Sequence, residues 1–149
     1  MPNLVVRKAD RSEKDARKLF SLLMVMSKDV GLPLPAVSAE RVLAQIANVI
    51  ENGVCYMAEH SGDLVGAIGL LPETPWWSRE NYLADTFFFV RSDKRASKAA
   101  TKLLRAAKEY AEEKDRPLAL TLFTGKDLFR KELFLAHHGF RKVGSLFAL

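Results

Sequence analysis

The sequence has few of the features that mark secreted, disulfide-rich or membrane proteins. It contains a single cysteine, Cys55, which excludes a disulfide within the chain and fits a reducing compartment. This cysteine lies in an apolar run, residues 54–58, so we interpret it as a small buried residue of a strand rather than a nucleophile. No apolar run reaches membrane-spanning length, and residues 1–3 begin no signal peptide. We therefore expect a cytoplasmic protein without a membrane partner.

The chain also lacks internal repeats, low-complexity tracts and linkers. Its 149 residues, 48% hydrophobic and 28% charged, are typical of one globular domain, which we expect to span 1–149. Lys and Arg number 23 against 18 Asp and Glu, so the formal net charge is +5. This excess favours an anionic partner and leaves a phosphorylated coenzyme, a nucleic acid and an acidic peptide open.

The segment 83–114 predicts a strand, a basic loop and a helix in succession. An apolar run at 86–90 predicts a buried strand, and residues 91–95 form a charged loop. Apolar residues then recur at helical spacing: Ala99, Ala100, Leu103, Leu104, Ala107, Tyr110 and Ala111. The first turn of a helix leaves backbone N–H groups without partners inside the helix, and the helix dipole makes that end partly positive. The segment therefore predicts a site for an anion, most often a phosphate, at the start of this helix.

The spacing in this segment resembles the acetyl-CoA-binding motif of the GNAT acetyltransferase superfamily. In that family a strand ends in Val, and a loop of the form Arg/Gln-x-x-Gly-x-Gly/Ala holds the pyrophosphate of coenzyme A. Val90 and Arg95 stand five apart, as the motif requires. Lys98 stands where the family usually has Gly, which allows close backbone approach, and Ala100 fills the last small position. The loop looks most like a small-residue variant found in divergent phage and prophage members.

The resemblance implies which residues bind the coenzyme. The end of the strand would meet the acetyl carbonyl and the pantetheine arm, and the loop with the first helical turn would hold the pyrophosphate: Phe89, Val90, Arg95, Ala96, Ser97, Lys98, Ala99, Ala100 and Thr101. A second motif of the family, Gly139-Phe140 after a short helix, is also present. The Tyr that the family usually has four residues before this Gly is replaced by Leu135.

The remaining segments follow the GNAT order of elements. We expect helices over about 12–29, 38–52 and 128–136, and further strands at 4–9, 54–59, 64–71, 118–123 and 145–149. The resemblance implies an α+β fold of three layers (α/β/α), with a mixed, mostly antiparallel central sheet of six or seven strands and helices on both faces.

Acetyl transfer to an amine needs a base for the amine and an acid for the departing thiolate. Asp85, in the predicted strand, is our candidate base because burial would raise its pKa; a solvent-facing residue at the strand entrance is the alternative. Leu135 cannot act as the family's Tyr does. His137 and His138 lie within one turn of it, and either can titrate near neutral pH or form a solvated helix cap. We expect no metal site, because adjacent His side chains on a helix diverge and no carboxylate or Cys pattern accompanies them.

Two loops are candidates for the acceptor site. The Pro-rich segment 31–37 is either a lid over the acceptor or an ordinary loop between helices. Trp76 and Trp77 stand in a loop, and they either line the acceptor pocket or cap the edge of the core.

Three functions remain open. The first is an N-acetyltransferase, monomer or homodimer, that moves acetyl from acetyl-CoA to an unidentified amine by direct attack in a ternary complex. The second is a catalytically silent GNAT-like module that binds coenzyme A or a protein. The third is nucleic-acid binding through the basic stripe of Lys98, Lys102 and Arg105, which can also be a merely solvated face. We disfavour it, because the strand aromatics lack the Lys/Arg-Gly-Phe signature of RNA-reading sheets.

Overall fold

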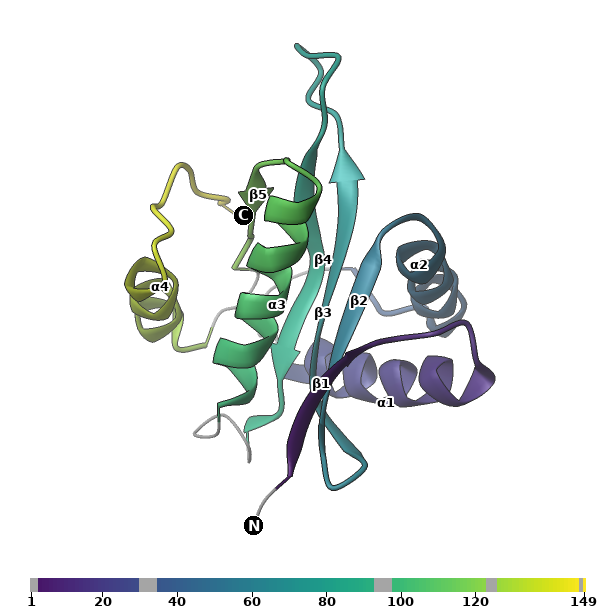
Figure 1. The fold of residues 1–149 in the computed structure, drawn as a ribbon. Helices are drawn as coiled ribbons and strands as arrows, with labels where there is room; N and C mark the ends of the chain where they lie inside the picture. The colour runs from purple at the N-terminus through teal and green to yellow at the C-terminus, as the bar shows by residue number, and fades with distance from the viewer. Residues whose placement is uncertain (1–2, 30–34, 93–97, 123–125, 148) are drawn as a thin grey trace.

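The fold is described from a computed structural model that covers residues 3–29, 35–92, 98–122, 126–147 and 149. Its elements in chain order are β1 (Leu4–Lys8), α1 (Glu13–Asp29), α2 (Ala39–Asn52), β2 (Val54–His60), β3 (Asp63–Glu73), β4 (Tyr82–Val90), α3 (Ala99–Glu113), β5 (Leu118–Ala119) and α4 (Leu128–His137). Figure 1 shows a central sheet with α1 and α2 on one side and α3 on the other, and α4 beside α3.

The sheet has the strand order β1-β2-β3-β4-β5. The first three pairings are antiparallel, whereas β4 and β5 run parallel and pair at only two positions, Leu83 with Leu118 and Ala84 with Ala119. This mixed, mostly antiparallel sheet with helices on both faces confirms the expected fold class. The described residues form five strands rather than the six or seven expected.

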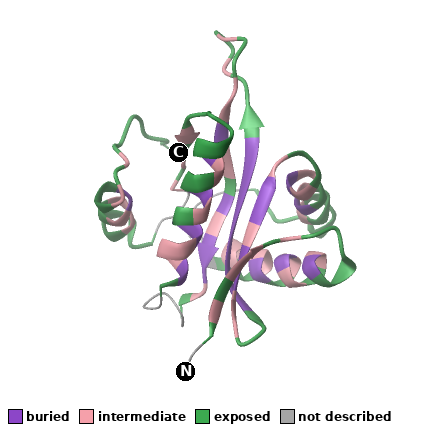
Figure 2. Ribbon diagram, in the orientation of Figure 1, coloured by how far each residue is buried: buried purple, intermediate pink, exposed green. Residues whose placement is uncertain are grey.

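Alternate residues of the strands divide the core into two clusters. On one face, strand residues pack against α1 and α2, in a cluster of Leu19, Leu22, Ile46, Val49, Cys55, Met57, Leu64, Ala67, Leu71, Phe87 and Phe89. On the other face they pack against α3, in a cluster of Val54, Ala58, Val65, Ile68, Leu70, Val90, Ala99, Leu103 and Ala107. Figure 2 shows the buried residues concentrated along the middle strands, which have helices on both sides. The period of two along each strand explains this division.

Local signals set the helix ends that matter for the site. The Ser38 hydroxyl accepts a hydrogen bond from the Arg41 N–H at 3.4 Å and so caps the start of α2. At the end of α4, the Phe140 N–H donates to the Leu135 carbonyl at 3.0 Å, and Gly139 has φ +92°. This is a Schellman ending, in which a left-handed residue favours glycine. The expected Gly139 stop is therefore confirmed.

The C-terminal part departs from the expectation. β5 is only two residues long, and neither residues 120–122 nor residues 141–147 form a strand. The apolar side chains Val143, Leu146 and Phe147 are exposed. An apolar run forms a strand only where a neighbouring strand supplies backbone partners, and β5 here pairs with β4 alone. The terminal strand predicted at 145–149 is therefore not formed among the described residues of that segment.

The two candidate acceptor loops have different outcomes. Trp76 and Trp77 lie in the turn between β3 and β4, which projects beyond the sheet, and are 92% and 71% exposed. Their rings contact each other edge to face, with centroids 5.5 Å apart. Because both side chains are exposed, the interpretation that they cap the edge of the core is wrong. Residues 31–34 of the proposed lid lie outside the described residues. Within the described ranges, no helix is long and apolar enough to cross a membrane.

Candidate active site

A β-bulge in β4 determines which way Asp85 faces. In the pairing of β3 with β4, Gly69 lies opposite Phe87 but Leu70 lies opposite Asp85, so Thr86 is an extra residue. Residues paired across a sheet lie on the same face, and Leu70 belongs to the cluster that packs against α3. Asp85 therefore lies on the α3 face, although simple alternation would place it with Phe87 on the opposite face.

Asp85 stands where β4 and β5 separate. The parallel pairing ends at Ala84 and Ala119, and an Asp85 carboxylate oxygen, Oδ1, accepts a hydrogen bond from the Thr121 N–H at 2.9 Å. Asp85 is half-buried, and burial raises its pKa to about 6, against the opposing effect of the Thr121 hydrogen bond. It is therefore not the solvent-facing carboxylate of a strand entrance. A carboxylate of this pKa can accept a proton at neutral pH.

The predicted coenzyme-binding residues are only partly described. Arg95, Ala96 and Ser97 lie outside the described residues. Phe89 and Val90 are buried in β4, in the α1/α2 and α3 clusters respectively. Lys98 is the exposed N-cap residue of α3, and its side chain makes no capping hydrogen bond.

The start of α3 has a charge that suits an anion. The first turn contains Ala99, a buried residue, followed by half-buried Ala100 and Thr101, and has no acidic side chain. The positive end of the helix dipole is therefore not offset by a carboxylate of the first turn. A phosphate group at this end would be stabilised by the dipole and by the positive charge of Lys98, the N-cap residue.

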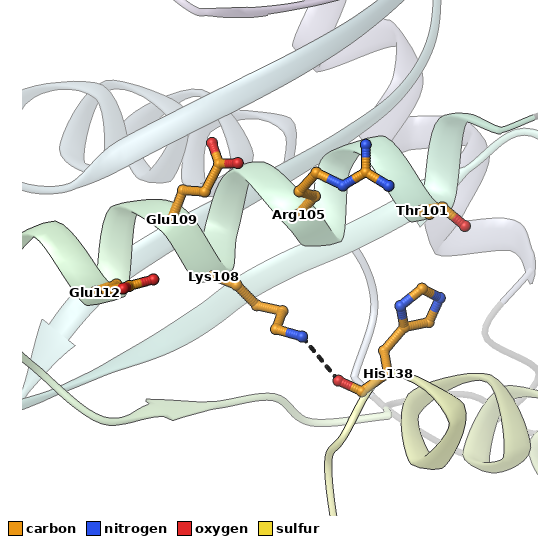
Figure 3. Close-up of a pocket in the computed structure, with 6 residues that line it drawn as sticks. All are labelled: Thr101, Arg105, Lys108, Glu109, Glu112 and His138. Carbon is orange, nitrogen blue, oxygen red and sulfur yellow. Dashed lines mark hydrogen bonds between the residues drawn. The ribbon is translucent and has the colours of Figure 1, made fainter.

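A groove lies between α3 and the end of α4 (Figure 3). Its volume is about 220 Å³, and its lining residues are Thr101, Arg105, Lys108, Glu109, Glu112 and His138. The Lys108 ammonium donates to the His138 carbonyl at 2.9 Å, which ties the end of α4 to α3. Ligand pockets commonly measure about 300 to 1,000 Å³, so this groove can hold only part of a large ligand such as a coenzyme.

The structure separates the two adjacent histidines. His138 is half-buried and lines the groove, whereas His137 is exposed. The His138 ring packs against the Phe134 ring with centroids 4.6 Å apart. Burial, followed by His137, Lys108 and Arg105, holds the pKa of His138 below its ordinary value. Sequence reasoning could not choose between the two histidines, because the choice depends on how α4 is placed against α3.

The basic stripe on α3 is not a single surface. Lys98 and Arg105 are exposed, but Lys102 is half-buried, and its ammonium donates to the Leu4 carbonyl at 3.3 Å. Lys102 therefore fastens α3 to β1. Lys108 lines the groove, although the sequence analysis did not name it. Its spacing of seven residues from Thr101 places both residues on one face of α3, and this spacing could have indicated Lys108 from the sequence.

Cys55 is buried in β2, as interpreted from the sequence, and burial raises its pKa to about 12, so it is an inert thiol near neutral pH. Among the described residues, no three His, Cys, Asp or Glu side chains come together to hold a metal ion.

Comparison with known proteins decides the family. Residues 26–140 match the model of the Acetyltransferase (GNAT) family. The chain belongs to the GNAT acetyltransferase family. No curated protein sequence matches the chain.

Solved structures share the GNAT fold over nearly the whole chain. A predicted acetyltransferase from Clostridium acetobutylicum, solved with acetyl-CoA, is 20% identical with a TM-score of 0.72, covering 99% of this chain and 96% of that one. The aminoglycoside N-acetyltransferase AAC(6')-Iy in complex with CoA is 13% identical with a TM-score of 0.73, covering 100% and 95%. A ribosomal-protein-alanine N-acetyltransferase from Brucella melitensis is 14% identical with a TM-score of 0.70, covering 99% and 98%. At these identities the likeness establishes the fold alone.

Proposed function

We propose that this GNAT protein transfers an acetyl group from acetyl-CoA to an amine by direct attack, with Asp85 as the general base. The observation that carries the proposal is the position of Asp85. It is a half-buried carboxylate of raised pKa, on the α3 face, at the point where β4 and β5 separate. As the nitrogen of a neutral amine bonds to the acetyl carbon and becomes positively charged, it can lose a proton to Asp85 directly or through one water.

The coenzyme is assigned to the start of α3 and the adjoining end of β4. Structural neighbours are complexes with CoA and acetyl-CoA, and the first turn of α3 has no acidic residue to repel a pyrophosphate. Arg95 and Ser97 would contact the phosphates, and the backbone of β4 near Phe89 and Val90 would hold the acetyl carbonyl as it becomes an oxyanion.

The acceptor amine is not chosen by these features. Neighbours of nearly equal structural similarity carry names that point to an aminoglycoside and to a ribosomal-protein alanine. A small amine, a peptide N-terminus, a lysine and a nucleotide amine are therefore all to be offered in the assay.

The test joins coenzyme binding with turnover. Calorimetric titration with coenzyme A should give saturable binding, and the Arg95→Ala/Ser97→Ala double variant should bind more weakly while its melting temperature stays unchanged. Release of free thiol from acetyl-CoA should depend on an amine from the panel. Equal coenzyme affinity in the double variant would remove the pyrophosphate assignment from this loop.

The alternative is a silent GNAT-like module, which the apolar Leu135 at the usual Tyr position favours. Such a module binds coenzyme A in the titration but releases no thiol with any amine of the panel.

A further inference from the structure

The proposed reaction lacks an obvious proton donor for the thiolate that leaves. Leu135, counted as the family's Tyr position, has no ionisable group and is 9% exposed. A positioned acid typically raises the rate about 10²- to 10⁴-fold, so an enzyme without one would turn over more slowly. The groove between α3 and α4, on the same face of the sheet as Asp85, contains the candidate replacement.

The groove contains one side chain whose ordinary titration range includes neutral pH. A hydroxyl such as that of Thr101 is too weak an acid, and Arg105 does not give up its proton in proteins. The Lys108 ammonium is bonded to the His138 carbonyl. Glu109 and Glu112 come from the later turns of α3, away from the predicted phosphate end (Figure 3). The imidazole of His138 is left, and imidazole changes its charge between about pH 5 and 8.

The position of His138 is fixed on two sides. Its ring packs on Phe134 and its carbonyl is bonded to Lys108, so the imidazole is held at the mouth of the groove. Figure 3 shows the ring directed toward the part of α3 that carries Arg105 and Thr101. Leu135, which is buried and does not line the groove, lies three residues earlier, about one helical turn away. A proton donor at 138 therefore replaces one at 135 within a single helical turn.

The charges around His138 favour release of its proton. From α3, the cations Arg105 and Lys108 and the carboxylates Glu109 and Glu112 line the same groove, and His137 adjoins it on α4. Burial, followed by His137 and the two cations, lowers the pKa of His138, so its protonated ring is a stronger acid than an ordinary imidazolium.

We infer that His138 protonates the sulfur of coenzyme A as the acetyl group departs, a role that rests on the proposed acetyl transfer. As the tetrahedral intermediate collapses, the C–S bond breaks and its electron pair goes to sulfur. The imidazolium N–H bond then breaks, an S–H bond forms, and His138 is left neutral. It takes a proton from water before the next turnover, while the proton of the amine leaves through Asp85.

The test compares two adjacent histidines. His138→Gln removes the acid and keeps an amide of similar size, whereas His137→Gln, at the exposed neighbour, is the matched control. We expect kcat to fall about 10²-fold in His138→Gln and much less in His137→Gln, which removes only a neighbour of the His138 ring and not the acid itself. The wild type should show kcat falling as pH rises through the pKa of His138, and this limb should be absent from the His138→Gln profile. Adding Leu135→Tyr to His138→Gln should restore part of the lost rate.

Other results would overturn the inference. An increase in KM for acetyl-CoA at constant kcat makes His138 a binding residue only. An unchanged kcat and pH profile in His138→Gln leaves the proton transfer to water or another group. A loss of coenzyme affinity or of melting temperature in the variant would assign the effect to structure. If the wild type itself binds coenzyme A but releases no thiol, the proposed function fails first, and this inference falls with it.

Discussion

Replacing Asp85 by Asn tests two effects of the carboxylate separately: the loss of folding stability that its charge causes, and its contribution to the catalytic rate. The Asn side-chain oxygen can still accept the Thr121 N–H, while the charge and the base are lost. Because the folded pKa of about 6 lies above the ordinary value of 3.8, ionised Asp85 destabilises the folded state. A difference of this size corresponds to about 3 kcal/mol, and partial contact with solvent lowers the expected effect to about 1 to 2 kcal/mol.

The sign of the effect changes with pH in a defined window. Wild-type stability should decrease as pH rises from about 4 through about 6, where Asp85 ionises in the folded state. At pH 7.5 the Asp85→Asn protein should therefore melt higher than wild type, by about 2 to 4 °C for each kcal/mol gained. Below pH 4 the two proteins should be equally stable, since Asp85 is neutral in both states.

Activity should move in the opposite direction. We expect kcat of Asp85→Asn to be about 10²- to 10⁴-fold lower, and the rise of the wild-type rate through about pH 6 to be absent. Urea unfolding at several pH values and initial rates of thiol release provide both measurements. An Asn variant that is less stable at pH 7.5 contradicts the raised pKa, and one with the wild-type rate and pH profile refutes Asp85 as the base.

Two further predictions concern the scaffold. The Arg7 guanidinium donates to both carboxylate oxygens of buried Asp15 and holds the pKa of Asp15 at about 2. This pair therefore stabilises the fold above about pH 4, and the stabilisation is lost as pH falls through 2. Asp15→Asn should lose about 2 kcal/mol in urea unfolding at pH 7 and much less near pH 2; an equal loss at both pH values would contradict the linkage. Gly53→Ala would place a Cβ 1.9 Å from the Leu70 carbonyl oxygen and should cost about 1 to 3 kcal/mol or more, whereas Gly144→Ala, with open space around it, should unfold at the wild-type urea concentration.

Most of the fold could be predicted from the sequence because its signals are local. Helical periodicity indicated α1, α2, α3 and α4, and Ser38 and Gly139 marked ends that the structure confirms. The strand, loop and helix of 83–114 indicated the family through a spacing that is itself local. The terminal strand was mispredicted, since a strand depends on a partner distant in the sequence.

The site depended on tertiary structure at three residues. Asp85 could be named from the sequence, but its face is set by a bulge opposite Gly69 and Leu70, and its pKa by burial where β4 leaves β5. The two adjacent histidines were equivalent in the sequence, and only the packing of α4 on α3 placed His138 in the groove and left His137 outside it. Helical periodicity and helix caps depend on residues that are close in the sequence, so they can be predicted from the sequence alone. Desolvation and sheet register arise between segments far apart in the sequence, and only the folded structure decides them.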